Sequence, residues 1–170
     1  MFSSRSRQAA QADFEALFNQ HWDRLCRAAA QITGDPDEAE DLALEAFLQY
    51  HNRPPARDEN PGGWLYRTVT NLALNALRTR RRREHYEQAA ALESEPPEDA
   101  ARLAERRMEQ RRVRETLAAL PSRTAQLLVL RHTGLSYAEI ATALQVAPGS
   151  VGTLLARAEK DFEQLYHEYK

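Results

Sequence analysis

Residues 134–155 read GLSYAEIATALQVAPGSVGTLL, and they decide the fold of the second half of the chain. Ser136 and Glu139 have the spacing of a capping box, which marks the first turn of an α-helix. The apolar positions after this cap recur at the spacing of one buried helix face: Ile140, Ala141 and Leu144. Residues 145–147 form a short turn, and a further helix starts at residues 148–151. The stretch therefore predicts two helices joined by a tight turn.

An apolar segment precedes this pair of helices. Residues 125–130 (AQLLVL) predict a supporting helix, which residues 133–135 (TGL) break. The last helix continues with a buried stripe at Val151, Leu155, Ala158 and Phe162. The arrangement is typical of a helix-turn-helix, whose second helix lies in the DNA major groove. An ordinary helical hairpin without a role in DNA binding explains the same residues, so the motif alone leaves both interpretations open.

The first half of the chain also has helical periodicity. Residues 14–29 and 63–82 each carry apolar side chains at three- and four-residue spacing, and the segment between His51 and Gly63 is too rich in proline and glycine to be helical. No segment shows convincing strand alternation. We therefore expect an all-α fold of two small helical domains.

Residues 35–50 predict a helix with a second apolar side. Asp35 can cap its free backbone N–H groups, and Pro36 suits its first turn. Leu44 and Leu48 lie off the stripe that faces the core, beside the acidic residues of the same helix. This second side is available to a partner protein.

Charge is distributed in blocks, although the formal net charge is only −2. Residues 1–65 have a net charge of −5, residues 66–83 carry six arginines and no acid, residues 84–105 have a net charge of −6, and residues 106–170 have a net charge of +3. The block at 84–105 also contains paired prolines, which suits a linker better than a packed element. We expect domains at 1–83 and 106–170 joined by an acidic linker at 84–105.

The arginine block favours binding to nucleic acid. Cations at the C-terminal end of a helix also interact favourably with the helix dipole. Six arginines within 18 residues are more than this interaction requires. Arginine pairs bidentately with phosphate, and Tyr66, Asn71 and Asn75 add stacking and hydrogen-bonding groups beside the charge.

Composition excludes several other classes of protein. The chain of 170 residues has no apolar run long enough to cross a bilayer and no signal peptide, and its one cysteine, Cys26, forms no internal disulfide, so we expect a cytoplasmic protein without membrane insertion. The acids Glu38, Asp41 and Glu45 lack the Glu-x-x-His partners of a di-metal site. No phosphate loop or nucleophile set is present, and we expect no enzymatic activity, metal or cofactor.

Motifs in a fixed order give a more specific interpretation. DEAEDL (37–42), EAFL (45–48), WLYR (64–67) and NLALN (71–75) are followed by LP (120–121), LLVLR (127–131), GLSYAEIA (134–141) and GSV (149–151). The set resembles the extracytoplasmic-function (ECF) sigma factors of bacterial RNA polymerase, over residues 13–83 and 106–166. The resemblance implies a dissociable subunit that binds core polymerase and directs it to promoters.

The resemblance also implies roles for individual residues. It implies that Asp41, Leu42, Glu45 and Leu48 contact the clamp helices of the polymerase β′ subunit. It implies that the helix at 63–82 recognises and melts the minus 10 element and that the loop before this helix holds a flipped base. The residues implied are Arg57, Asn60, Trp64, Arg67, Asn71, Asn75 and Arg78. The linker would run toward the RNA path. The β flap and an anti-sigma factor are further expected partners.

The resemblance further implies that the minus 35 element is recognised by Arg131, Ser136, Tyr137, Ser150, Thr153 and Arg157. Here the chain departs from the family, which usually places Lys and Arg along the recognition helix; this chain has Gly152, Leu154 and Glu159 there. Residues 121–170 carry five basic and five acidic groups, so few phosphate contacts are expected.

Two other functions are consistent with parts of the sequence. A stand-alone helix-turn-helix regulator would use only the C-terminal motif, which the neutral recognition helix disfavours. A helical adaptor that binds only proteins would use the acidic face with Leu44 and Leu48, but it leaves the arginine block and the order of the motifs unexplained.

Overall fold

The computed structural model describes residues 2–56, 59–87 and 98–168. Within them the chain is helical and contains no strand, in agreement with the all-α prediction. The elements are α1 (Phe2–Thr33), α2 (Pro36–Asn52), α3 (Pro61–Glu87), α4 (Glu98–Ala119), α5 (Ser122–His132), α6 (Tyr137–Leu144), the 3-10 turn η2 (Pro148–Ser150) and α7 (Val151–Glu168).

The first three helices pack around an aromatic cluster. Phe47 of α2 is fully buried, and its ring lies 5.9 Å from that of Phe14 and 4.8 Å from that of Phe18, both on α1. Trp22 stacks on Phe18 with their ring centroids 4.8 Å apart. Because aromatic rings bury the most area per residue, this cluster fixes how α2 lies on α1.

Local signals in the sequence set the beginning of α2. The Asp35 side chain accepts hydrogen bonds from the backbone N–H groups of Asp37 and Glu38, at 3.0 and 3.3 Å, which confirms the predicted cap. Gly34 precedes the cap with a φ of +72°, a conformation that favours glycine, and it ends α1. The turn between α1 and α2 is therefore short and fixed in direction.

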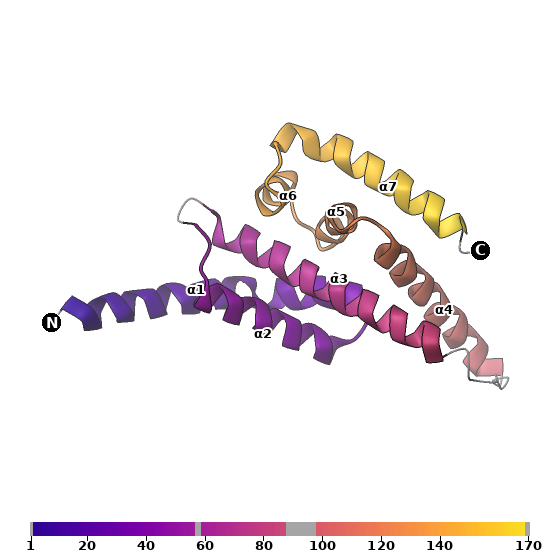
Figure 1. Cartoon of the computed structure of the whole chain (residues 1–170), viewed down its shortest axis with the longest axis horizontal. Coiled ribbons are helices and arrows are strands. Elements are labelled where there is room, and N and C mark those ends of the chain that lie inside the picture. Colours follow the sequence, from indigo (N-terminus) through magenta and orange to yellow (C-terminus); the bar gives the residue numbers. More distant parts are fainter. Residues whose placement is uncertain (1, 57–58, 88–97, 169–170) are drawn as a thin grey trace.

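The second half forms the expected helix-turn-helix. Ser136 accepts a hydrogen bond from the Glu139 backbone N–H while the Glu139 carboxylate accepts one from the Ser136 backbone N–H, so the predicted capping box is confirmed. Helix α6 ends at Leu144 and is capped by Gln145, which has a left-handed backbone, and η2 leads into α7. Helix α7 covers α5 and α6 along the top of the molecule (Figure 1).

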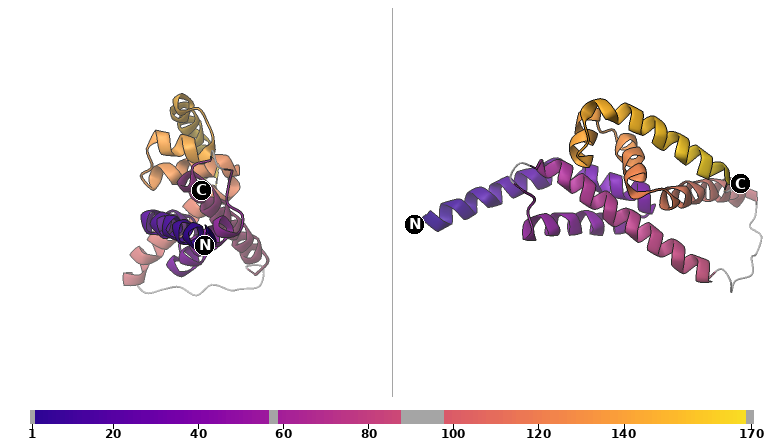
Figure 2. Two further views of the ribbon diagram at one scale, coloured as in Figure 1. Left: turned by 90° about the vertical axis from the view of Figure 1, so that its left-hand side faces the viewer. Right: turned by 45° about the horizontal axis from the view of Figure 1, so that its top comes forward.

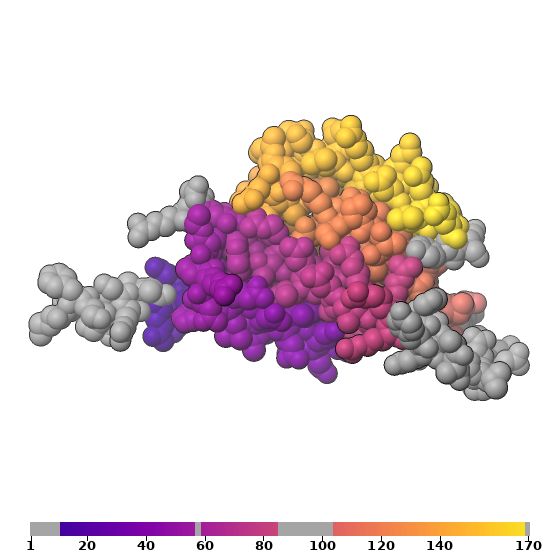
Figure 3. Space-filling view, in the orientation of Figure 1, coloured from indigo at the N-terminus to yellow at the C-terminus, as the bar shows by residue number. Residues whose placement is uncertain are grey.

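The two halves lie against each other along α3. Helix α3 contacts α1 and α2 on one side and α4, α5 and α6 on the other, as Figures 1 and 2 show. The buried apolar residues of both halves form one continuous cluster. On the face shown in Figure 3, the orange and yellow surface of α5–α7 rests on the magenta surface of α3.

The helices extend further into the acidic segment than expected. Helix α3 continues to Glu87 and α4 already begins at Glu98, whereas we expected a linker over 84–105. Contacts between the two helices explain part of this extension, because Arg111 of α4 pairs with Glu84 of α3 at 3.4 Å. Residues 88–97 of the expected linker lie outside the described residues.

Candidate polymerase and nucleic-acid interfaces

The outer face of α2, defined here as Asp41, Leu44, Glu45 and Leu48, points to solvent. Leu44 is 46% exposed and Leu48 is 52% exposed, and both acids are exposed beside them. Gln49 donates to the Glu45 carboxylate at 3.0 Å. Single exposed leucines are common, but two on successive turns with flanking acids form a surface suited to a basic, partly apolar partner.

Leu42, also expected in the docking surface, lies differently. It is half-buried and packs against the core, whereas Leu44 takes an outward position. Because Leu42 and Leu44 are two residues apart on a helix, they point about 200° apart around the axis. The sequence reasoning identified Leu44 as outward-facing but left it out of the docking residues.

The inner face of α3, defined here as Arg67, Asn71 and Arg78, meets the second half of the chain. The Arg67 guanidinium pairs with the Glu59 carboxylate and donates to the carbonyl oxygen of Ala143 in α6 at 3.1 Å. The Gln145 side chain donates to the same Glu59 carboxylate at 3.1 Å. Residues from both halves thus share one ion pair.

Gln126 of α5 makes a second connection to this face. Its side chain is buried, with 5% of its surface exposed. Its Nε2 lies 3.0 Å from Asn71 Oδ1, 3.0 Å from Thr70 Oγ1 and 3.2 Å from the Arg67 carbonyl oxygen. A buried amide needs such partners because an unsatisfied donor is costly.

Arg78 is held by the end of α4. Its guanidinium donates to the carbonyl oxygens of Ala118 and Leu120, at 3.1 and 2.9 Å, and to Ser122 Oγ at 2.8 Å. A cation at a helix C-terminus satisfies carbonyls that lack a partner within the helix. All three inner-face residues, which were expected to contact DNA, are therefore engaged by the second half.

The remaining residues expected to contact the minus 10 element lie around this face. Asn60 caps α3, since its Oδ1 accepts from the Gly63 N–H at 2.8 Å. Trp64 is half-buried, and its ring lies edge-on to Tyr50 at 5.8 Å. Asn75 is exposed and lines a polar groove on α3 with Thr79. Arg57 lies outside the described residues.

Part of the arginine block has structural partners. Arg80 pairs with Glu38 of α2 and donates to the Thr33 carbonyl oxygen at 3.0 Å, which ties α3 to the turn between α1 and α2. Arg82 and Arg83 are exposed. Some arginines of the block therefore bond to other helices, whereas Arg82, which donates to Thr79 Oγ1 at 3.3 Å, and Arg83 form an exposed cationic surface.

A polar cluster joins α1, α3 and α6. Arg24 pairs with Glu139 at 3.2 Å, and its guanidinium lies 5.7 Å from the centre of the Tyr66 ring. Burial, and then the charge of Arg24, lowers the pKa of His21, while burial raises the pKa of Tyr66. Hydrogen bonding from the Ser136 backbone is the main cause that lowers the pKa of Glu139. Among the described atoms, His21 Nδ1 and Tyr66 OH are buried without a hydrogen-bond partner.

The residues expected to read the minus 35 element lie around the helix-turn-helix. The Arg131 guanidinium lies 5.4 Å from the Tyr137 ring centre, and Tyr137 is 45% exposed. Tyr137 also lies close to Gly152 at the start of α7. Ser136, Ser150, Thr153 and Arg157 are exposed, with Ser150 in η2 and the last two on α7.

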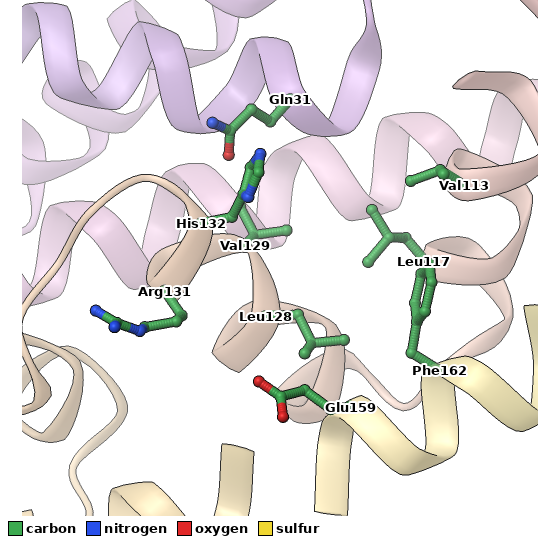
Figure 4. A pocket seen from close by; sticks show the side chains of 9 residues that line it. All are labelled: Gln31, Val113, Leu117, Leu128, Val129, Arg131, His132, Glu159 and Phe162. Atoms are coloured by element: carbon green, nitrogen blue, oxygen red, sulfur yellow. The ribbon is translucent and has the colours of Figure 1, made fainter. Parts of the chain in front are cut away.

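A groove of about 650 Å³ lies between α4, α5 and α7 (Figure 4). Its floor is apolar and contains Leu117, Leu128 and Phe162, and Gln31 of α1 approaches from the opposite side. The sequence pattern did not reveal this groove, because helical periodicity alone does not fix how α4, α5 and α7 pack on one another.

Other kinds of site find no support in the part of the chain that the structure describes. It contains no group of three or more His, Cys, Asp or Glu residues that could hold a metal ion. No helix there is long and apolar enough to span a bilayer.

Comparison with known proteins identifies the family. The family model for sigma-70 region 2 matches residues 17–83, and that for sigma-70 region 4 matches residues 110–162. The RNA polymerase sigma-H factor of Pseudomonas aeruginosa is 31% identical over 89% of this chain and 84% of its own length. The chain belongs to the sigma-70 family. It is an ECF-type sigma factor, as the resemblance implied.

Two further proteins agree with this assignment. The ECF RNA polymerase sigma factor SigE of Mycolicibacterium smegmatis is 31% identical over 97% of the chain, which spans 65% of that relative's length. The solved structure of the sigma factor RpoE in complex with the anti-sigma factor NepR, from Bartonella quintana, superposes with a TM-score of 0.53 at 19% identity. That match covers 90% of this chain and 96% of RpoE, and it supports the fold.

Proposed function

We propose that this sigma factor binds core RNA polymerase through the outer face of α2 and opens promoter DNA with α3. The observation that carries the proposal is the outward position of Leu44 and Leu48 between Asp41 and Glu45 in a chain with both sigma-70 regions. Leu42 supports this surface from below. The partner is the pair of clamp helices in the β′ subunit.

Promoter melting is assigned to α3 and to the loop before it. Trp64, Arg67, Asn71, Asn75 and Arg78 provide stacking, hydrogen-bonding and cationic groups for the separated strand, and residues 57–60 hold the flipped base. Exposed Asn75, Arg82 and Arg83 support this role, although Arg82 also donates to the Thr79 hydroxyl on the same helix at 3.3 Å.

The helix-turn-helix is assigned to the minus 35 element. Arg131 and Tyr137 lie close together near the start of α7, where Ser150 and Thr153 are exposed. The low charge of this domain predicts weak binding that depends on the polymerase holding the domain over DNA. The apolar groove between α4, α5 and α7 suits a helix of the polymerase β flap.

The proposed function implies a place of action and a regulator. The sigma factor acts in the cytoplasm, where core polymerase is, and it has no catalytic activity of its own, since the polymerase performs the chemistry. An anti-sigma factor is the expected regulator, and the structural relative RpoE was solved with one. The domain division at 1–83, 84–105 and 106–170 is part of this proposal.

Gel filtration of the purified chain with bacterial core RNA polymerase, without DNA and at moderate salt, tests the proposal. We expect co-elution. A folded chain that elutes apart from active core, yet binds promoter DNA alone, would support the stand-alone regulator instead.

A further inference from the structure

A group of arginines surrounds a small cavity of about 140 Å³ where the end of α3 packs on α4 (Figure 1). We call this space the arginine cavity. Its charged lining residues are Arg80, Arg81 and Glu84 of α3 and Arg111, Arg114 and Glu115 of α4. Four arginines and two glutamates give the lining a net charge of +2. The function proposed above uses none of these six side chains.

Three of the four arginines are held in place by bonds within the chain. Arg80 is bonded to α2 and to the end of α1. Arg81 donates to the carbonyl oxygen of Glu115 at 3.4 Å. Arg111 pairs with the Glu115 carboxylate at 3.1 Å and with that of Glu84 at 3.4 Å. These bonds fix the guanidinium groups around the cavity.

Arg114 is the exception. It is half-buried, and within the described residues its guanidinium makes no hydrogen bond or ion pair. A Cβ atom on Gly34 would lie 2.7 Å from Arg114 Nη1 and 2.9 Å from its Cζ, so the guanidinium packs against the backbone at the end of α1. Burial, and then the charge of Arg80, lowers the pKa of Arg114. A cation is therefore held beside other cations without a counter-charge.

A structural role at the end of α1 is the alternative explanation for Arg114. Cations are favourable at a helix C-terminus, because the last carbonyl oxygens lack partners within the helix. Arg80 already fills this role, since it donates to the Thr33 carbonyl oxygen at 3.0 Å. The two explanations differ in their consequence: a structural Arg114 stabilises the chain by itself, whereas a ligand-binding Arg114 costs stability until an anion arrives.

The chemistry of the arginine cavity suits phosphate groups. A guanidinium offers five N–H donors in a planar fork that matches phosphate oxygens. Pockets that hold a whole small molecule have volumes of roughly 300–1,000 Å³. The arginine cavity, at about 140 Å³, has room only for the phosphate end of a ligand. A diphosphate presents oxygens toward α3 and α4 together, whereas a single phosphate presents them at one point.

We propose that the arginine cavity binds the diphosphate group of a small ligand, either inorganic pyrophosphate or a nucleoside diphosphate, with Arg114 supplying the unpaired positive charge. Arg80 and Arg81 flank the group from α3, and the sugar and base of a nucleotide stay outside the cavity. This site goes beyond the proposed function and does not depend on the roles of α2 and α3 in it.

Titration calorimetry of the full chain at constant ionic strength tests the proposal, with inorganic pyrophosphate, adenosine diphosphate and adenosine monophosphate as probes. We expect one site per chain for the first two probes. The monophosphate should bind at least about tenfold more weakly, because it lacks the second phosphate group. Equal affinity for pyrophosphate and the nucleotide identifies the diphosphate alone as the ligand, and tighter binding of the nucleotide identifies a nucleotide. No saturable binding of either would overturn the proposal.

Two variants and a control locate the site. Arg114→Gln should weaken pyrophosphate binding at least about tenfold, because the unpaired cation is lost. Arg107→Gln, on the exposed side of the same helix, is the matched control and should leave binding unchanged. Glu84→Gln removes an acid from the cavity and should tighten binding by about threefold, an effect that a damaged fold does not produce. Equal losses in Arg114→Gln and Arg107→Gln would show general charge attraction instead of a site.

Thermal unfolding distinguishes the ligand-binding role of Arg114 from the structural one. Without ligand, Arg114→Gln should unfold at the same temperature as the parent chain or higher, because repulsion from Arg80 and Arg111 is removed. Pyrophosphate should raise the unfolding temperature of the parent chain only, since a ligand stabilises the folded state that binds it. A lower unfolding temperature for Arg114→Gln, with pyrophosphate binding unchanged, would assign Arg114 to the end of α1 and overturn the proposal.

DNA is the competing source of phosphate. A single-stranded oligonucleotide without terminal phosphates should not displace pyrophosphate, because the cavity is too small for a nucleotide of a continuous strand. Displacement at an equal concentration of phosphate groups would place the arginines on a DNA-binding surface and overturn the proposal. These measurements contain no polymerase, so a failure of the proposed function, seen in gel filtration with core polymerase, is observed separately.

Discussion

The outer face of α2 and the inner face of α3 belong to neighbouring helices, yet only the inner face of α3 is bonded to the second half of the chain. On α2, Leu44 and Leu48 are about half exposed with acids beside them. On α3, Arg67 and Asn71 are bonded to the second half of the chain. Both surfaces are expected to bind partners. The difference shows that the two expected partner surfaces start from different states: the α2 face is exposed, whereas Arg67 and Asn71 on α3 already have hydrogen-bond partners within the chain.

Alanine substitution of Arg67, Asn71 and Asn75 should have the largest effect. We expect polymerase binding to be spared and promoter opening to fall about 100-fold or more, because one phosphate-binding guanidinium and two hydrogen-bonding amides are lost together. Permanganate reactivity of unpaired thymines measures opening. Asn75→Ala alone sharpens the comparison, since Asn75 is exposed and lies outside the inner face of Arg67, Asn71 and Arg78 that contacts the second half. Unchanged transcription by the triple variant would refute the assignment to α3.

Charge reversal on the outer face of α2 should have the next largest effect. Asp41→Lys with Glu45→Lys is expected to weaken binding to core polymerase by about 10- to 100-fold, because both acids are exposed to a basic partner. Competition between labelled and unlabelled sigma factor for core measures this. Glu163→Lys on exposed α7 is the control for net charge and should leave polymerase binding unchanged.

Substitutions at two adjacent residues of α2 should distinguish an effect on stability from an effect on polymerase docking. Phe47→Ala removes a fully buried ring from the aromatic cluster and should lower the free energy of unfolding by about 3–5 kcal/mol. Leu48→Ala should cost about 0.5 kcal/mol or less, since Leu48 is half exposed, while weakening polymerase binding. Urea unfolding followed by circular dichroism gives both free energies. Equal losses of stability would show that Leu48 is part of the core.

The smallest expected effect is a pH dependence from His21. Burial holds the pKa of His21 below its ordinary 6.5 in the folded chain, so the unfolded chain binds more protons between the two values. Stability should therefore fall as pH drops below about 6.5, and His21→Gln should flatten this slope. Glu139 contributes in a more acidic window, below 4.5, where its carboxylate becomes protonated. Urea midpoints at several pH values between 5 and 8 measure the slope, and an unchanged slope in His21→Gln would exclude this residue as its source.

Helix caps and helix faces were predictable from the sequence, because they depend on residues that are close together in the chain. Asp35 caps α2, Ser136 and Glu139 form a capping box, and Leu44 and Leu48 point outward, all as expected. Helical periodicity also gave the core faces, since burial follows the spacing of apolar residues.

The covered face of α3 was not predictable, because its partners are distant in the sequence. Gln126 lies 55 residues from Asn71, and Ala143 lies 76 residues from Arg67. Nothing around Gln126 distinguishes it from a surface glutamine until α5 lies on α3. Glu59 was missed for a related reason: its pairing with Arg67 depends on how the loop folds back before α3.

The exposed Leu44 and Leu48 also matter when copies of this sigma factor outnumber core polymerase. If the outer face of α2 is the polymerase-docking surface, every copy in excess of core polymerase keeps two half-exposed leucines in contact with water. A basic, partly apolar surface on any other protein would therefore compete with core polymerase for this helix.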